Sequence, residues 1–208
     1  MPAADARRLT SRYQRAQEAV GVMVAKEAAS EAASWLRTGD IDDGLDDFIA
    51  RVTRLVMAGR ATSENIAAAY YEALRAAEGI TSPRPFAPRR LFSINRLIAG
   101  LIYTGPRYAK ALTRRDETQN LHKVVGEAVG RNAMRHTLNA GRSVIFDSVS
   151  SDPDAWGWAR LTDADPCNFC AMLAGRGPVY KTAESAGELN RWHDGCACTV
   201  IPVLKENQ

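Results

Sequence analysis

Cysteine and histidine residues gather in the last fifth of the chain at spacings that suit a metal ion. All four cysteines lie there, with one of the three histidines beside them. Cys167 and Cys170 are separated by two residues, so one turn can present both thiolates to the same ion. After 25 further residues Cys196 and Cys198 follow, just behind His193. Because Zn²⁺ takes four nitrogen or sulfur donors in a tetrahedron, this stretch offers one donor more than a zinc ion needs.

Disulfides and free buried thiols are the two alternatives to a metal site. Disulfides are disfavoured because the chain begins without an apolar signal core, so we expect it to fold in a reducing cytosol. Scattered thiols are disfavoured because no cysteine precedes Cys167. We expect one structural zinc, held by Cys167, Cys170 and two of His193, Cys196 and Cys198. All four cysteines, with His193 outside them, are the first choice, and the tight Cys196-x-Cys198 spacing leaves that order open.

One enzyme signature is half present. Pro166-Cys-x-x-Cys170 matches the second half of the zinc deaminase pattern, but no H-x-E supplies the first half. The chain also has no G-x-S-x-G elbow, phosphate-binding glycine loop or H-E-x-x-H helix. His122 and His136 have no metal-ligand spacing and are expected to be ordinary core or surface histidines. The sequence therefore predicts a protein that is not an enzyme, with a zinc hydrolase or deaminase as the weaker alternative.

Composition bounds the class of protein. Hydrophobic residues make up 46% and charged residues 25% of the 208, which is ordinary for a globular chain. The net charge of +3 is too small to imply nucleic-acid binding by itself. No apolar run approaches the roughly 20 residues of a membrane span. We expect one or two globular domains and no membrane partner.

Apolar residues at helical spacing predict long helices before the cysteines. Helices are expected over residues 3–37, over 41–58, from Thr62-Ser63 to Gly79, and over 115–149. Leu97, Ile98, Leu101 and Ile102 mark a further amphipathic helix. The first three helices would form a bundle or a helical hairpin.

The sequence pattern departs from that of long helices at two places, a proline-rich segment and the stretch after Pro153. Three prolines within six residues mark residues 81–90 as a linker. After Pro153, Trp156-Gly-Trp158 predicts a strand with both rings on one face, packed on the metal site or on helix 115–149. Short strands are also expected at residues 179–181 and 198–203. The expected fold is mainly α, with an N-terminal long-helix bundle and a small α+β, zinc-stapled module at the C-terminus. Its regions are 1–80 (helical), 81–90 (linker), 91–152 (helical, basic) and 153–208 (the C-terminal module).

A run of basic residues lies between Gly79 and Arg115, where eight Lys or Arg residues occur with no Asp or Glu. Such a block suits phosphate groups or an acidic protein partner. It suits equally a solvated surface balanced by the aspartates at 40–47. The residues expected on one exposed surface are Arg89, Arg90, Arg107, Lys110, Arg114 and Arg115.

The cysteine stretch also resembles a known family. Asp163-x-Asp-Pro-Cys-x-x-Cys-x-x-Leu-x-Gly, followed by His-x-x-Cys-x-Cys-x-x-x-Pro202, is similar to the C-terminal signature of phage Mu F-like head morphogenesis proteins. The chain has Asp194 where that pattern has Pro, and Ala197 where it has Arg. The resemblance covers only residues 156–203.

The resemblance implies a role that composition cannot. It implies a bacteriophage minor capsid protein with a structural role in head assembly, bound to the portal or the major capsid protein. Several copies would lie in the virion, inside the capsid or at the portal vertex, after assembly in the host cytoplasm. Contact with packaged DNA is a further expectation. A nucleic-acid-binding zinc module is the alternative from a different class.

Overall fold

A computed structural model describes residues 2–37, 39–83, 91–164, 166–178, 180–182, 185 and 192–205. The chain is mainly helical, with one small two-stranded sheet near its C-terminal end. Most of the predicted linker, residues 84–90, lies outside the described residues, as do Arg89 and Arg90.

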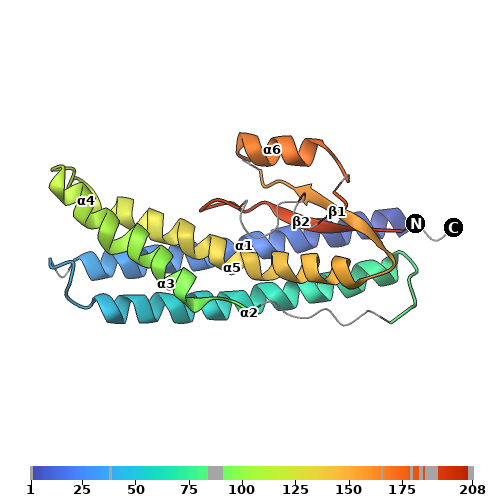
Figure 1. The fold of residues 1–208 in the computed structure, drawn as a ribbon, viewed down its shortest axis with the longest axis horizontal. Coiled ribbons are helices and arrows are strands. Elements are labelled where there is room, and N and C mark those ends of the chain that lie inside the picture. The colour runs from blue at the N-terminus through green and yellow to red at the C-terminus, as the bar shows by residue number, and fades with distance from the viewer. Residues whose placement is uncertain are drawn as a thin grey trace.

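Three long helices, α1 (Pro2–Leu36), α2 (Leu45–Ala77) and α5 (Leu121–Ser151), lie side by side along the long axis of the molecule (Figure 1). The predicted helix over 3–37 is confirmed as α1. It ends before Gly39, whose positive φ of 87° no helix can continue. Apolar residues at three- and four-residue steps bury the inner face of α1: Tyr13, Val20, Val24, Ala28, Ala32 and Trp35.

The two helices predicted over 41–58 and 63–79 are one helix, so that prediction was wrong. The apolar rhythm of α2 runs through the expected break, and Ser63 is fully buried. Its hydroxyl donates to Gln17 Oε1 at 2.6 Å and accepts from Gly141 N–H at 3.0 Å. Ser63 therefore joins all three long helices instead of capping one of them.

Glycines in α5 allow it to approach α1 closely. A Cβ built on Gly126 would lie 2.9 Å from the carbonyl oxygen of Ala29, and one on Gly130 would lie 2.6 Å from that of Ala25. Since backbone oxygens cannot move aside without moving the helix, these two glycines set the separation of α1 and α5. α5 begins at Leu121 and not at residue 115, because Asp116 and Asn120 both have positive φ.

A helical arm lies beside one half of α5 (Figure 1). It consists of α3 (Ile94–Ile102), the π-helical turn η1 (Tyr103–Arg107) and α4 (Tyr108–Arg114). The amphipathic character predicted for residues 97–102 is confirmed, because Leu97 and Leu101 are completely buried. Pro106 lies in the π-turn, where its missing N–H interrupts the usual helical ladder.

The small sheet and helix α6 (Asn168–Gly175) form a layer over α1 and α5 (Figure 1). Strands β1 (Ala155–Leu161) and β2 (Thr199–Leu204) pair antiparallel, and Tyr180 makes one further bridge to Trp158. The two tryptophans do not share a face as predicted. A register shift between Ala155 and Gly157 leaves Trp156 58% exposed, whereas Trp158 is buried against Phe146 of α5.

The buried apolar residues described in this layer share a core with the helices. One cluster of buried residues combines Tyr13, Tyr71 and Phe146 of the long helices with Trp158, Cys170 and Val200. A second cluster fills the other half of the bundle beneath the helical arm. The C-terminal layer is therefore attached to the bundle through shared apolar packing.

A buried ion pair fastens the ends of α2 and α5. Arg75 and Asp152 are 2% and 5% exposed and form a hydrogen-bonded salt bridge. Tyr71 donates to the same carboxylate at 2.8 Å, and Arg75 also donates to Ser82 O at 2.7 Å. The first residues after α2 are thereby held against the end of α5.

Candidate metal centre

Two segments distant in sequence bring the five predicted donors together. Cys167 caps the start of α6, where its sulfur accepts the N–H of Cys170 at 3.4 Å. Cys170 points inward from the first turn of that helix and is completely buried. Cys196 and Cys198 come from the loop that enters β2, and His193 lies just before them. These five residues are called the cysteine cluster below.

The donor atoms form two overlapping groups that share Cys170. In one, the ligand atoms of Cys167, Cys170 and His193 lie within 4.8 Å of one another, and in the other those of Cys170, Cys196 and Cys198 do. The Cys170 and Cys196 sulfurs are 3.7 Å apart. A tetrahedral zinc ion with bonds of about 2.3 Å to sulfur places neighbouring sulfurs about 3.8 Å apart. A single ion can therefore take ligands from both groups.

All four cysteines are free thiols, which removes the disulfide alternative for this structure. A separation of 3.7 Å far exceeds the roughly 2.05 Å of a disulfide bond. Cys170, Cys196 and Cys198 are buried, Cys167 is half-buried and His193 is exposed. His193 Nε2 lies 3.1 Å from Cys167 Sγ, at the solvent side of the cluster. The imidazole can act as a ligand or as an outer partner of the Cys167 thiolate.

Two buried arginines enclose one tryptophan beside the thiols. The guanidinium carbons of Arg142 and Arg160 lie 3.9 and 3.7 Å from the Trp192 ring centroid. Arg142 donates to the carbonyl oxygens of Cys196 (2.7 Å) and Cys198 (2.6 Å), and Arg160 Nη1 lies 3.7 Å from the Cys170 sulfur. Buried cations this close to thiols favour the thiolate form, which is the form that binds a metal.

The thiol pKa values are displaced in opposite directions. The pKa of Cys196 is lowered to about 5, first by the hydrogen bond with Cys198 and also by the charge of Arg142. Burial, together with the charge of Cys196, raises the pKa of Cys170 to about 12. Without a cation, the first thiolate thus opposes ionisation of its neighbour. A divalent metal ion would supply the charge that lets several of them ionise together.

The loop that carries the second donor group is docked on α5. Asp194 forms an ion pair with Arg135, and Gly195 N–H donates to Arg131 O at 3.0 Å. Gly195 has a φ of +83°, so this turn favours glycine. Asp163 Oδ2 accepts the N–H of Ala197 at 3.1 Å, which links the segment before α6 to the loop between the last two cysteines. Contacts outside the cluster therefore help to place the donors.

A family comparison covers almost the whole chain. Residues 4–208 match the VG15 protein family. The chain belongs to the VG15 family. The Gene 15 protein of Mycobacterium phage D29 is 31% identical over 103 residues, a match covering 34% of this chain and 38% of that relative. The chain thus spans well under half of the relative's length. Family and relative support a phage origin for the protein.

The resemblance to phage Mu F-like head morphogenesis proteins was wrong as a family assignment. It depended on one short stretch, residues 156–203, whereas the VG15 match spans 4–208. Cysteine and histidine spacings are set by the coordination needs of a metal ion, so similar spacings occur in unrelated proteins. No solved structure matches the chain. Among the described residues, no helix is both long and apolar enough to cross a membrane.

The predicted basic surface is brought together only in part. Arg107 and Arg115 line one cavity between the helical arm and α5. Lys110 instead forms an ion pair with Asp42 at 2.6 Å. This pair agrees with the alternative interpretation, in which the aspartates at 40–47 balance the basic residues. Arg114 is exposed but does not line that cavity, and Arg89 and Arg90 lie outside the described residues.

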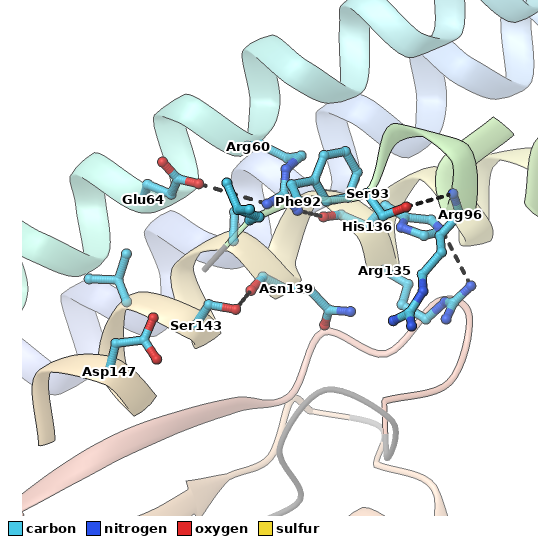
Figure 2. Close-up of a pocket in the computed structure, with 13 residues that line it drawn as sticks. Arg60, Glu64, Phe92, Ser93, Arg96, Arg135, His136, Asn139, Ser143 and Asp147 are labelled. Atoms are coloured by element: carbon cyan, nitrogen blue, oxygen red, sulfur yellow. Dashed lines mark hydrogen bonds and ion pairs between the residues drawn. The ribbon is translucent and has the colours of Figure 1, made fainter. Parts of the chain in front are cut away.

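The other two histidines lie away from the cysteine cluster. His122 is exposed, and His136 is buried edge-on to the ring of Phe92. Burial, together with the charge of the nearby Arg135, lowers the pKa of His136 to about 4, so this imidazole is neutral at pH 7. It lines a cavity of about 460 Å³ between α2, α5 and the start of α3. Figure 2 shows Asp147 at one end of that cavity, Arg96 and Arg135 toward the other end, and Arg60 and Phe92 between them. Arg60 lies 3.6 Å from the Phe92 ring centroid.

Three residues beside the thiols, Arg142, Arg160 and Trp192, were not predicted from the sequence. A signal existed for Arg142, which occupies a position of the apolar stripe of α5 between Leu138 and Ile145. An arginine in a buried helical stripe requires acceptors nearby, and here they are the carbonyl groups of the cysteine loop. Trp192 and Arg160 give no comparable periodic signal, because only the tertiary fold places them together.

Proposed function

We propose that this chain is a structural protein of a phage particle, without enzymatic activity, whose C-terminal module is held closed by one zinc ion. The observation that carries the proposal is that two segments bring five nitrogen and sulfur donors into two neighbouring groups of three, which share Cys170. Zinc prefers thiolate and imidazole donors in a tetrahedral arrangement, whereas calcium and magnesium prefer oxygen donors.

A structural role for the metal follows from the number of donors. A catalytic zinc keeps one position open for water, whereas four protein ligands close the site. The cysteine cluster offers four thiols and one imidazole, enough to fill every position of a tetrahedral ion. Cys170 belongs to both groups of donors and is therefore the first choice as a ligand, whereas His193 is the most replaceable because it lies at the exposed edge.

The proposed place of the protein is in the particle, as a minor capsid protein that contacts the portal or the inner shell during head assembly. The VG15 assignment and the relative in a mycobacteriophage support the phage origin on which this proposal rests. Three large apolar side chains of the C-terminal module, Trp156, Phe169 and Met172, are 58%, 39% and 48% exposed. Apolar side chains of this size, where they form one contiguous patch, favour contact with another protein.

The proposal is tested by separating purified particles from unassembled proteins and locating the chain by mass spectrometry. We expect it in intact particles, in several copies each. We also expect Cys170→Ser phage to yield particles that lack the chain, and His193→Ala phage to retain it. A chain found only outside particles would contradict the structural role, and a zinc-dependent hydrolytic activity lost in Cys170→Ser with the fold intact would assign the metal to catalysis.

A further inference from the structure

A second cavity, of about 400 Å³, lies between the helical arm and α5. On one side the cavity is lined by residues of the arm, which lie in two rows with four-residue spacing along the helix. Residues of α5 line the other side. The lining residues are Tyr103, Thr104, Arg107, Tyr108, Ala111, Leu112, Arg115, Ala128 and Arg131. We call it the arginine cavity.

Three arginines converge on this cavity, and no carboxylate is among its described lining residues. Arg107 and Arg115 are exposed and lie two helical turns apart on the arm, whereas Arg131 faces them from α5. Arg131 is 3.8 Å from Glu127, in an ion pair whose side chains are each about half exposed. A surface pair of this kind is worth little and yields readily to a better anion.

Aromatic rings lie next to the arginines. Tyr103 is 70% exposed, although large apolar rings usually find cover in a folded domain. Tyr108, one helical turn along the arm and in the neighbouring row, is half-buried in the same cavity. Both rings flank Arg107 in the lining, and Tyr103 belongs to the π-helical turn. π-Helical turns within helices are frequent at functional sites.

We propose that the arginine cavity binds a single strand of nucleic acid, with phosphates on Arg107, Arg115 and Arg131 and a base stacked on Tyr103. Single-strand sites combine a cationic groove with exposed rings on which bases stack. An acidic peptide would use the arginines but would leave the Tyr103 ring without a partner. A duplex keeps its bases stacked inside and would reach only the charges. This inference goes beyond the structural role.

The test is fluorescence anisotropy of the full-length, zinc-loaded protein with a labelled thymidine oligonucleotide of about 12 nucleotides, across a salt series. We expect binding that weakens as salt rises, since phosphate contacts release counterions. Arg107→Ala with Arg115→Ala should weaken binding at least tenfold and make the salt dependence shallower. Tyr103→Ala should weaken it about fivefold or more, and Tyr103→Phe should preserve it. A uridine ribo-oligonucleotide as competitor distinguishes RNA from DNA as the source of the strand.

The matched control is Arg8→Ala with Arg12→Ala, which removes the same charge near the start of α1, at the other end of the bundle from α4 (Figure 1). This variant should bind as the unchanged protein does. Equal weakening by the control would overturn the proposal in favour of general electrostatic attraction. The proposal would also be overturned if polyglutamate or duplex DNA bound more tightly than the oligonucleotide and Tyr103→Ala had no effect. The cavity would then bind its partner through charge alone. No binding at low salt would also overturn the proposal.

Discussion

Arg142 is the residue that connects the helical bundle to the metal centre. It is 3% exposed on α5, yet its guanidinium donates to Asn139 and to the carbonyl oxygens of Cys196 and Cys198. Burial lowers its pKa to about 10, which still leaves it charged at pH 7. The charge therefore remains beside the thiolates, where it offsets the negative charge of a cysteine-ligated ion.

Replacing Arg142 should weaken the fold as well as the metal site. We expect Arg142→Met to lower the free energy of unfolding by about 3 kcal/mol, because several charge-assisted hydrogen bonds are lost and their acceptors stay buried. Urea unfolding of the zinc-loaded protein measures this. Arg131→Met, an exposed position on the same helix, should change it by only about 0.5 kcal/mol. Similar unfolding midpoints for the two variants would show that the buried guanidinium does not support the loop.

At the scale of elements, close helix approach and a buried ion pair hold the bundle together. Gly126 and Gly130 let α5 lie against the backbone of α1, and Ser63 connects α2 to both. Arg75 and Asp152 fasten the far ends of α2 and α5. The layer that carries the cysteine cluster lies on α1 and α5, so the placement of these helices determines the placement of the donors.

Gly130→Ala tests the close approach. The added methyl would lie 2.6 Å from the carbonyl oxygen of Ala25, so α1 and α5 must separate. We expect a loss of stability of about 1–3 kcal/mol, typical of overpacking, measured by thermal and urea unfolding. Gly175→Ala is the matched control, because a Cβ there meets nothing within 4 Å. Equal stability of the two variants would mean that the helices do not need this contact.

Asp152 should make stability depend on pH in acid. Burial alone would raise its pKa, but the Asp154 N–H, the Tyr71 hydroxyl and Arg75 together hold that pKa below its ordinary value. A carboxyl group whose pKa is lower in the folded than in the unfolded protein stabilises the fold. That stabilisation is fully present at pH values above the pKa in the unfolded protein, which is about 3.9. That contribution is lost as pH falls through the folded value.

We therefore expect Asp152→Asn to cost about 3–5 kcal/mol at pH 7, as breaking a buried ion pair does, and to show a shallower loss of stability below pH 4. Unfolding free energies at several pH values give both quantities. Asp5→Asn removes an exposed pair with Arg8, whose side chains are 60% and 84% exposed, and should change little. If the unfolding free energy of Asp152→Asn falls below pH 4 as steeply as that of the unchanged protein, other carboxyl groups cause the acid sensitivity.

At the scale of the whole molecule, the long helices and the C-terminal layer share one apolar cluster but differ in what closes their loops. The bundle is held by packing along its length, whereas the donors lie in the connection between the two short strands, residues 162–198. Metal binding in isolated zinc-finger peptides contributes about 10–16 kcal/mol. We therefore expect metal binding to supply most of the free energy that closes those loops.

Removing the metal should distinguish the stability that comes from packing of the bundle from the stability that comes from metal binding. With a chelator we expect residues 156–203 to lose fixed structure, seen as a change in tryptophan fluorescence, while most far-ultraviolet helical signal persists. Trp158 and Trp192 are buried, so loosening of the layer exposes them to water. Loss of the whole helical signal at the same chelator concentration would show instead that bundle and layer unfold as one unit.

Much of this architecture follows from local patterns in the sequence, and the exceptions have physical reasons. The steps Val20, Val24 and Ala28 predict α1 correctly, and the cysteine spacing identifies the donors that the fold brings together. The break predicted at Thr62-Ser63 failed because a buried serine found partners on other helices. The paired faces of Trp156 and Trp158 failed because a strand irregularity shifts the alternation. Arg160 and Trp192 meet only through tertiary folding, which no local pattern encodes.

Native mass spectrometry of the purified full-length protein tests the zinc-closed module most directly. We expect a mass increase equal to one zinc ion per chain, which disappears under denaturing conditions and in Cys170→Ser. A chain that carries no metal after purification with zinc present, with its four thiols unligated or joined in disulfides, would contradict it.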